Sequence, residues 1–164
     1  HRTKYTLPIP PSPNLPNMKA VYLYPATCYF EATPVSLGRG TSLPFQIYGH
    51  PNMTGYDYSF TPKSVPGAKN PPQLNKLCHG VNLSNMSDEE IWKRGVDLSY
   101  VIDAYKNLNI GDHFFRPFFE LLVGTDYVRK MIIEGKSAEE IKNRWKGDVE
   151  KFKEQRKPYL LYQE

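Results

Sequence analysis

The stretch from Tyr29 to Phe45, YFEATPVSLGRGTSLPF, gathers the side chains with the clearest potential for chemistry. Its polar members are a carboxylate, two hydroxyls and an arginine between glycines: Glu31, Ser36, Thr41, Arg39, Gly38 and Gly40. Because glycine takes positive φ without a steric cost, the Gly-Arg-Gly run lets the backbone approach a ligand closely. The guanidinium then offers a rigid fork of donors that matches a carboxylate or a phosphate. The stretch therefore predicts one wall of a polar pocket. The alternative is a surface turn whose arginine pairs with a neighbouring side chain.

Glu31 is the best candidate for acid–base chemistry. It lies between Phe30 and Ala32, and apolar surroundings raise the pKa of a carboxyl group towards the range of a general acid. In the alternative interpretation, Glu31 forms an ion pair with Arg39 and holds the loop closed. Glycoside hydrolysis normally needs a second carboxylate. Asp57, on an expected strand, is a weak candidate whose position is more typical of an exposed side chain.

A second group of polar candidates occupies the loops of residues 44–83. Aromatic rings occur there beside imidazole, amide and ammonium groups, and this mixture suits the flat faces and hydroxyl fringe of a sugar. The candidates are His50, Tyr48, Tyr56, Tyr58, Lys69 and Asn70. The sequence therefore favours a glycan or another polar molecule as the ligand class.

No metal or cofactor is expected. Cys28 and Cys78 lack the CxxC spacing of a zinc site, and His79 alone does not complete a tetrahedral set. The sequence has no Gly-x-Gly-x-x-Gly, P-loop, HExxH or Gly-x-Ser-x-Gly motif. A nucleophilic cysteine would need Cys28 or Cys78 to pair with a histidine. The only indication of such a pair is that His79 follows Cys78 in the sequence. The two cysteines are either free thiols or a disulfide that closes a loop of about 50 residues.

Charge and hydropathy argue against two further classes of partner. The net charge is +4, and Lys and Arg alternate with Asp and Glu in the C-terminal half. That pattern is typical of solvated helix faces and predicts no nucleic-acid partner. No apolar run approaches the ~18 residues that span a bilayer, so no transmembrane segment is expected.

The arrangement of apolar and turn residues predicts an α+β fold, with a loop-rich half of short strands followed by a helical half. Five prolines make residues 1–16 an extended arm or linker. Strands are expected in PFQIYGHP, GYDYSFTP and LCHGVNL. Helices are expected from Asn17 to a stop at Pro25, at 87–94, 98–108, from Pro117, at 128–135 and at 137–157. Six apolar residues are expected to form core: Phe114, Phe115, Phe118, Phe119, Leu121 and Leu122. The last residues, Tyr159 to Tyr162, are expected as an edge strand or a packed tail.

The motifs of the first half resemble the bacterial exo-β-N-acetylmuramidase family NamZ. The family pattern runs SPN-x-P, YP-x-TC-x-FE-x-T, S-x-GRGT-x-x-PF and G-x-P. Here these segments are Ser12–Pro16, Tyr24–Thr33, Ser36–Phe45 and Gly49–Pro51. Phe60–Pro62, Lys69–Pro71 and Cys78–Gly80 also resemble the family, and Ala32 departs from it where glycine is common.

This resemblance implies a domain organisation and an activity. Residues 17–164 correspond to a C-terminal auxiliary domain, and residues 1–16 to the arm that follows a Rossmann-like N-terminal domain. The family releases N-acetylmuramic acid from the non-reducing end of peptidoglycan fragments, in a cleft between the two domains. The implied partners are a muropeptide or a disaccharide that contains N-acetylmuramic acid, and the upstream domain. The implied location is the periplasm or the cell surface.

The resemblance also assigns roles within the chain. Most catalytic carboxylates of the family lie on the N-terminal domain, so this domain alone is expected to be inactive. Glu31 is the one catalytic candidate here. Arg39 is expected to bind the lactyl carboxylate that distinguishes muramic acid from glucosamine. The expected substrate-binding residues are Ser36, Gly38, Arg39, Gly40, Thr41, His50 and Asn70. Two alternatives are a non-catalytic glycan-binding module and a scaffold domain whose Gly-Arg-Gly loop is only structural.

Overall fold

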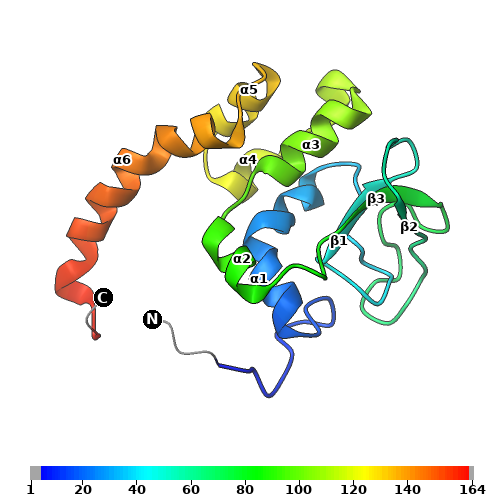
Figure 1. Ribbon diagram of the computed structural model, residues 1–164, viewed down its shortest axis with the longest axis horizontal. Coiled ribbons are helices and arrows are strands. Elements are labelled where there is room, and N and C mark those ends of the chain that lie inside the picture. Colours follow the sequence, from blue (N-terminus) through cyan, green and yellow to red (C-terminus); the bar gives the residue numbers. More distant parts are fainter. Residues whose placement is uncertain (1–4, 163–164) are drawn as a thin grey trace.

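The computed structural model describes residues 5–162, and it places a small sheet beside a group of helices (Figure 1). The elements are α1 (Met18–Thr27), η1 (Cys28–Ala32), β1 (Ile47–His50), β2 (Tyr58–Phe60), β3 (Cys78–Asn82), α2 (Asp88–Arg94), α3 (Ser99–Leu108), η2 (Gly111–His113), α4 (Phe118–Val123), α5 (Tyr127–Ile133), α6 (Ala138–Arg156) and η3 (Lys157–Tyr159). The α+β prediction is confirmed, with the short strands preceding most of the helices. None of the helices in residues 5–162 is long and apolar enough to span a membrane.

Helix α1 begins as the sequence predicts but ends later. The side chain of Asn17 accepts a hydrogen bond from the backbone N–H of Ala20 at 2.9 Å, which satisfies one of the free donors of the first turn. The prediction that Pro25 stops the helix is wrong, because the helix continues to Thr27. A proline removes only its own N–H from the helix. The Thr27 hydroxyl donates to the Leu23 carbonyl at 3.0 Å and supports the turn that contains the proline.

The sheet has the strand order β1-β3-β2, and both pairings are antiparallel. Its three strands lie in the three predicted segments. Gly49 of β1 lies directly opposite Gly80 of β3. On the other side of β1, Ser36 and Gly49 exchange two backbone hydrogen bonds, of 2.8 and 2.9 Å. The sheet therefore anchors the start of the Gly-Arg-Gly loop.

Serine caps start two of the later helices, as predicted. The Ser87 hydroxyl accepts from the Glu90 N–H at 3.1 Å at the start of α2. Ser137 and Glu140 form a complete capping box at the start of α6. Phe114 and Phe119 are fully buried, but Phe118 and Leu121 are 46% and 76% exposed. The prediction that all six apolar residues of 114–122 form core is wrong for these two, because the short helix α4 buries only one of its faces.

Helix α6 projects from the rest of the molecule towards the C-terminus (Figure 1). Its predicted apolar stripe of Ile141, Trp145, Val149 and Phe152 is covered only near the start of the helix. Ile141 is fully buried, whereas Val149 and Phe152 are 42% and 59% exposed. Residues 160–162, which follow η3, form no strand and stay exposed, in contrast to the predicted edge strand or packed tail.

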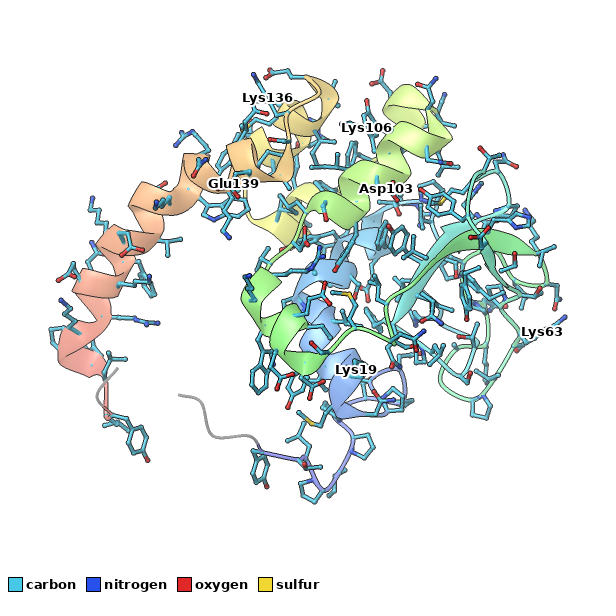
Figure 2. All side chains as sticks on the ribbon, in the orientation of Figure 1. Lys19, Lys63, Asp103, Lys106, Lys136 and Glu139 are labelled. Carbon is cyan, nitrogen blue, oxygen red and sulfur yellow. The ribbon has the colours of Figure 1, made fainter. Side chains whose placement is uncertain are left out.

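Helix α3 joins the helical half to the sheet. Asp103 lies on the side of α3 that faces the strands (Figure 2). One of its carboxylate oxygens accepts from the hydroxyls of Tyr48, at 2.9 Å, and Tyr56, at 2.7 Å. One turn later, the Asn107 side chain exchanges two hydrogen bonds with the backbone of Thr54, of 3.0 and 2.9 Å.

Both cysteines are free thiols. Cys78 is fully buried and Cys28 is half-buried. Burial raises the pKa of the Cys78 thiol from 9.0 to about 11. Burial, and then the charge of Glu31, raises the pKa of Cys28 from 9.0 to about 11 as well. The structure therefore favours the free-thiol alternative and keeps both groups protonated.

We expect Cys78 to make the domain less stable at high pH. Because the thiol loses its proton more readily in the unfolded chain, the unfolded state binds fewer protons between pH 9 and about 11, and stability falls as pH rises through that window. At about 1.4 kcal/mol per pKa unit, Cys78 contributes a loss of about 2 to 3 kcal/mol. Urea unfolding of the parent chain and of Cys78→Ala at pH 8 and pH 11 measures this loss. Equal losses in the two proteins would contradict the prediction.

Candidate functional site

The two glycines of the Gly-Arg-Gly loop have the predicted backbone geometry. Gly38 and Gly40 have φ angles of +81° and +82°. A Cβ atom on Gly38 would lie 2.5 Å from the Ile47 side chain, and one on Gly40 would lie 2.4 Å from the Lys63 carbonyl oxygen. The glycines therefore allow the loop to pack closely against the β half, and this packing fixes the position of Arg39 between them.

The two hydroxyls of the loop hold its shape. The Thr41 hydroxyl donates to the Gly38 carbonyl at 2.7 Å and accepts from the Leu43 N–H at 3.0 Å. Ser36 is fully buried, and its hydroxyl accepts from the Gly38 N–H at 3.4 Å. Neither hydroxyl lines the pocket that contains Arg39. Their predicted role as substrate ligands is not supported by this placement.

Arg39 and Glu31 come together in one pocket of about 230 Å³. The pocket lies between the turn at residues 12–15, the helices α1 and η1, and the Gly-Arg-Gly loop. Its lining residues are Ser12, Asn14, Leu15, Tyr24, Glu31, Arg39 and Phe45. This arrangement agrees with the prediction that Glu31 and Arg39 share a site. The alternative, an ion pair that closes the loop, finds no support, because no ion pair joins these two among the described residues.

Arg39 carries a donor that the protein itself does not satisfy. Its Nε atom is buried and has no hydrogen-bond partner. A buried donor without a partner costs about 1 to 3 kcal/mol, so native proteins keep few of them. An acceptor that enters the pocket and bonds to Nε recovers that cost. The pocket is therefore suited to a ligand with a carboxylate or another strong acceptor.

The rest of the pocket combines one negative charge with aromatic surface. Burial, and then the nearby charge of Glu31, raises the pKa of the Tyr24 hydroxyl. The rings of Tyr24 and Phe45 lie 5.1 Å apart at an angle of 46°. A carboxylate acceptor, a guanidinium donor and two rings suit a ligand that has an anionic group, hydroxyls and an apolar ring face.

The other predicted residues lie elsewhere. His50 ends β1, where its Nδ1 accepts from the Asn52 N–H at 3.1 Å, and burial, with the charge of Lys76, lowers its pKa. Asn70 is exposed in a loop. Neither lines the pocket of Arg39. In residues 5–162, no cluster of three or more His, Cys, Asp or Glu side chains is able to hold a metal ion.

Reasoning from residue chemistry missed five residues of the pocket, the rings of Tyr24 and Phe45 and three residues of one turn, Ser12, Asn14 and Leu15. The sequence places these three in the proline-rich arm, whose first four residues lie outside the described part of the chain. The Leu15 N–H donates to the Ser12 carbonyl at 2.9 Å, and the Asn14 side chain donates to the Gly67 carbonyl at 3.1 Å. The end of the arm is thus a turn fixed to the domain. The signal that marks it is the SPN-x-P motif.

A larger cavity of about 360 Å³ lies beside α4 and α5. Across it, Arg129 and Glu120 form an ion pair at 2.8 Å. These two side chains already pair with each other, and no residue predicted to bind a ligand lines this cavity. The smaller pocket of Arg39 is therefore the better candidate site.

Comparison with known proteins decides the family. The C-terminal family model of the exo-beta-N-acetylmuramidase NamZ matches residues 22–162. The chain belongs to the NamZ family. A curated NamZ relative, the peptidoglycan beta-N-acetylmuramidase NamZ of Bacillus subtilis strain 168, is 34% identical over 167 residues, which cover 93% of this chain and 40% of the relative.

Two solved structures of DUF1343 family proteins from Bacteroides fragilis extend the comparison. One is 81% identical and superposes with a TM-score of 0.98, covering 100% of this chain and 46% of the other. The second shares the fold, with 20% identity, a TM-score of 0.66, and coverage of 94% of this chain and 45% of the other. The chain therefore spans less than half the length of these NamZ-related proteins.

Proposed function

We propose that this chain is the C-terminal domain of a peptidoglycan-degrading N-acetylmuramidase, and that the pocket of Arg39 and Glu31 forms one wall of its active-site cleft. The observation that carries the proposal is the buried, unpaired Nε of Arg39 in a pocket that also holds a carboxylate and two aromatic rings. Membership of the NamZ family supports the substrate class. Because peptidoglycan lies outside the cytoplasmic membrane, the proposed location is the periplasm or the cell surface.

Arg39 is proposed to select muramic acid. N-acetylmuramic acid differs from N-acetylglucosamine by a lactyl ether that ends in a carboxylate. The guanidinium of Arg39 binds this group through charge-assisted hydrogen bonds, which are about twice as strong as neutral ones. The ring of Tyr24, which is 38% exposed and packs on the buried Phe45, contacts the apolar face of the sugar. The pocket should therefore bind muramic acid more tightly than glucosamine, which lacks the lactyl carboxylate.

Glu31 is proposed to act on the same sugar. As a carboxylate it accepts hydrogen bonds from sugar hydroxyls, and as a carboxylic acid it donates a proton to the glycosidic oxygen. Glycoside hydrolysis uses two carboxyl groups, and Glu31 is the only one among the residues that line this pocket. The proposal places the second on the upstream part of the longer polypeptide, where the cleft is completed.

We expect Arg39→Ala and Arg39→Lys to abolish the preference for muramic acid. Hydrogen bonds to charged groups contribute about 1.5 to 3 kcal/mol. The kcat/KM of the longer polypeptide should therefore fall about 10- to 150-fold on N-acetylmuraminide substrates. On N-acetylglucosaminides it should hardly change. Lysine does not rescue the enzyme, because an ammonium group lacks the planar fork.

The matched control is Lys106→Ala. It removes one positive charge from an exposed position on α3, outside the pocket (Figure 2). This variant should keep the kcat/KM of the parent on both substrates. An unchanged ratio between the two substrates in both Arg39 variants would contradict the proposed role of Arg39.

A non-catalytic glycan-binding module is the second candidate function. The observation that favours it is that the pocket offers a guanidinium donor and a single carboxylate, which is enough to bind a sugar but is not the pair that glycoside hydrolysis uses. NMR titration of the chain with N-acetylmuramic acid and N-acetylglucosamine separates the two functions. If the chain is a binding module, N-acetylmuramic acid should cause chemical-shift changes at residues 31–41, and N-acetylglucosamine should not. A cleft wall binds neither sugar until the upstream part is present.

A further inference from the structure

The outer half of α6 and the segment after it expose several large apolar side chains. Val149 and Phe152 lie on one side of the helix and are 42% and 59% exposed. The segment after the helix adds Tyr159, Leu161 and Tyr162, which are 84%, 91% and 78% exposed. Soluble proteins rarely expose large apolar patches of this kind without a partner. This face therefore needs an explanation that the pocket of Arg39 does not provide.

The exposed face continues into a groove between α6 and the rest of the domain. The groove has a volume of about 290 Å³, and most of its lining side chains are apolar. Trp145 and Val149 form its α6 side, and Val96 and Leu98, which lie between α2 and α3, form part of the opposite side. We call this groove, together with Phe152, the α6 surface. It is concave, so a convex partner can bury both sides at once.

The direction of α6 is the same in a longer protein. The chain superposes along its whole length on the 81% identical Bacteroides fragilis structure with a TM-score of 0.98. A score this high over the whole chain means that the 19-residue helix runs in the same direction in both structures. Within residues 138–156, however, only Ile141 is buried by the domain itself. The outer half of α6 therefore keeps its direction with little burial by its own domain.

We propose that the α6 surface is the docking site for the N-terminal part of the longer polypeptide. The family model that matches here describes the C-terminal part of NamZ, so the rest of such proteins precedes the matched segment. That remainder is more than half of each relative, because the chain covers only 40% and 46% of two of them. In Figure 1 the arm before α1 and the outer end of α6 lie on the same side of the molecule. A domain joined to the arm therefore reaches α6 without crossing the fold.

This docking does not depend on which ligand the pocket of Arg39 binds. Its test is hydrogen exchange in the longer polypeptide, followed by mass spectrometry, with no sugar present. In the parent, the amides of residues 145–156 should be protected. The double variant Val149→Glu/Phe152→Glu places two charges in the interface and should speed their exchange roughly 100-fold. Peptides that contain the buried Ile132 should not change, which shows that the domain stays folded.

The matched control is Asn143→Glu/Gly147→Glu. It adds the same two negative charges to exposed positions on the opposite face of α6, and a side chain at Gly147 meets no atom within 4 Å. It should keep the protection of the parent. If the double variant fails to fold, the milder Phe152→Ala takes its place, and it should increase the exchange rate roughly tenfold. Equal exchange in the parent and in the interface variants overturns the proposal. So does protection that increases with protein concentration, because a second copy then covers the α6 surface.

Discussion

Gly80→Ala is expected to destabilise the domain by roughly 3 to 5 kcal/mol, at the upper end of single substitutions. A Cβ atom at this position would lie 1.9 Å from the Tyr48 carbonyl oxygen and 2.6 Å from the Gly49 Cα atom. Both are backbone atoms of β1, so no side chain can turn away to make room. Strands β1 and β3 must therefore separate at the centre of the sheet. Urea unfolding followed by circular dichroism measures the loss.

The consequence of Gly80→Ala should reach the candidate site. Gly49 holds Ser36 through two backbone hydrogen bonds, and Ser36 begins the loop that carries Arg39. A displaced β1 therefore releases that loop, and the proposed selectivity of the longer polypeptide for muramic acid should be lost together with stability. Gly147→Ala is the control, because nothing lies within 4 Å of a Cβ atom there. It should leave the free energy of unfolding unchanged or raise it by up to about 1 kcal/mol. A similar loss in both variants would refute the argument from strand contact.

Gly40→Ala is expected to cost about 2 to 4 kcal/mol and to displace Arg39. Part of this cost is conformational, because alanine at a φ of +82° is unfavourable by about 1 to 2 kcal/mol. The rest is steric, because the new Cβ atom would lie 2.4 Å from the Lys63 carbonyl oxygen. The nearby hydrogen bond from the Lys63 N–H to the Gly40 carbonyl, at 2.9 Å, should lengthen or break. Stability is again measured by urea unfolding. The displacement of Arg39 is measured by the ratio of kcat/KM on N-acetylmuraminides and N-acetylglucosaminides in the longer polypeptide.

Gly55→Ala separates the two parts of that cost. Gly55 has a φ of +81°, almost the same as Gly40, but no atom lies within 4 Å of a Cβ atom there. Its substitution should show the conformational cost alone and leave selectivity intact. If Gly55→Ala and Gly40→Ala lower stability equally, the loop is not held by its contact with Lys63. The prediction would then be wrong.

Local signals predicted much of the fold. The caps at Asn17, Ser87 and Ser137 lie where the sequence indicates, because a cap is a contact between residues close in the chain. The end of α1 was less predictable. Proline removes one donor, but the contacts around Pro25 hold the helix for two further residues, and these contacts come from the folded molecule. The exposed Phe118 and Leu121 show the same limit, since apolar density does not say which face of a short helix meets the core.

The candidate site was predicted in part. Glu31 and Arg39 share a pocket, as the types of residue in their stretch indicate. Ser36 and Thr41 belong to the same stretch, yet they hold the loop instead of lining the pocket, because a hydroxyl serves equally well as a ligand or as a backbone cap. The turn at residues 12–15 completes the pocket through contacts across the chain, such as that of Asn14 with Gly67. Residue chemistry alone gives no sign of such long-range contacts.

The bonds of α3 to the β half decide how the domain comes apart. Asp103 and Asn107 together make four hydrogen bonds to Tyr48, Tyr56 and Thr54. These bonds cross the boundary between the strands and the later helices, and one hydrophobic core contains residues of both halves, so opening either half breaks contacts of the other. The two halves that differ so clearly in composition are therefore a single cooperative unit. A cut between them near residue 84 should therefore destabilise both fragments.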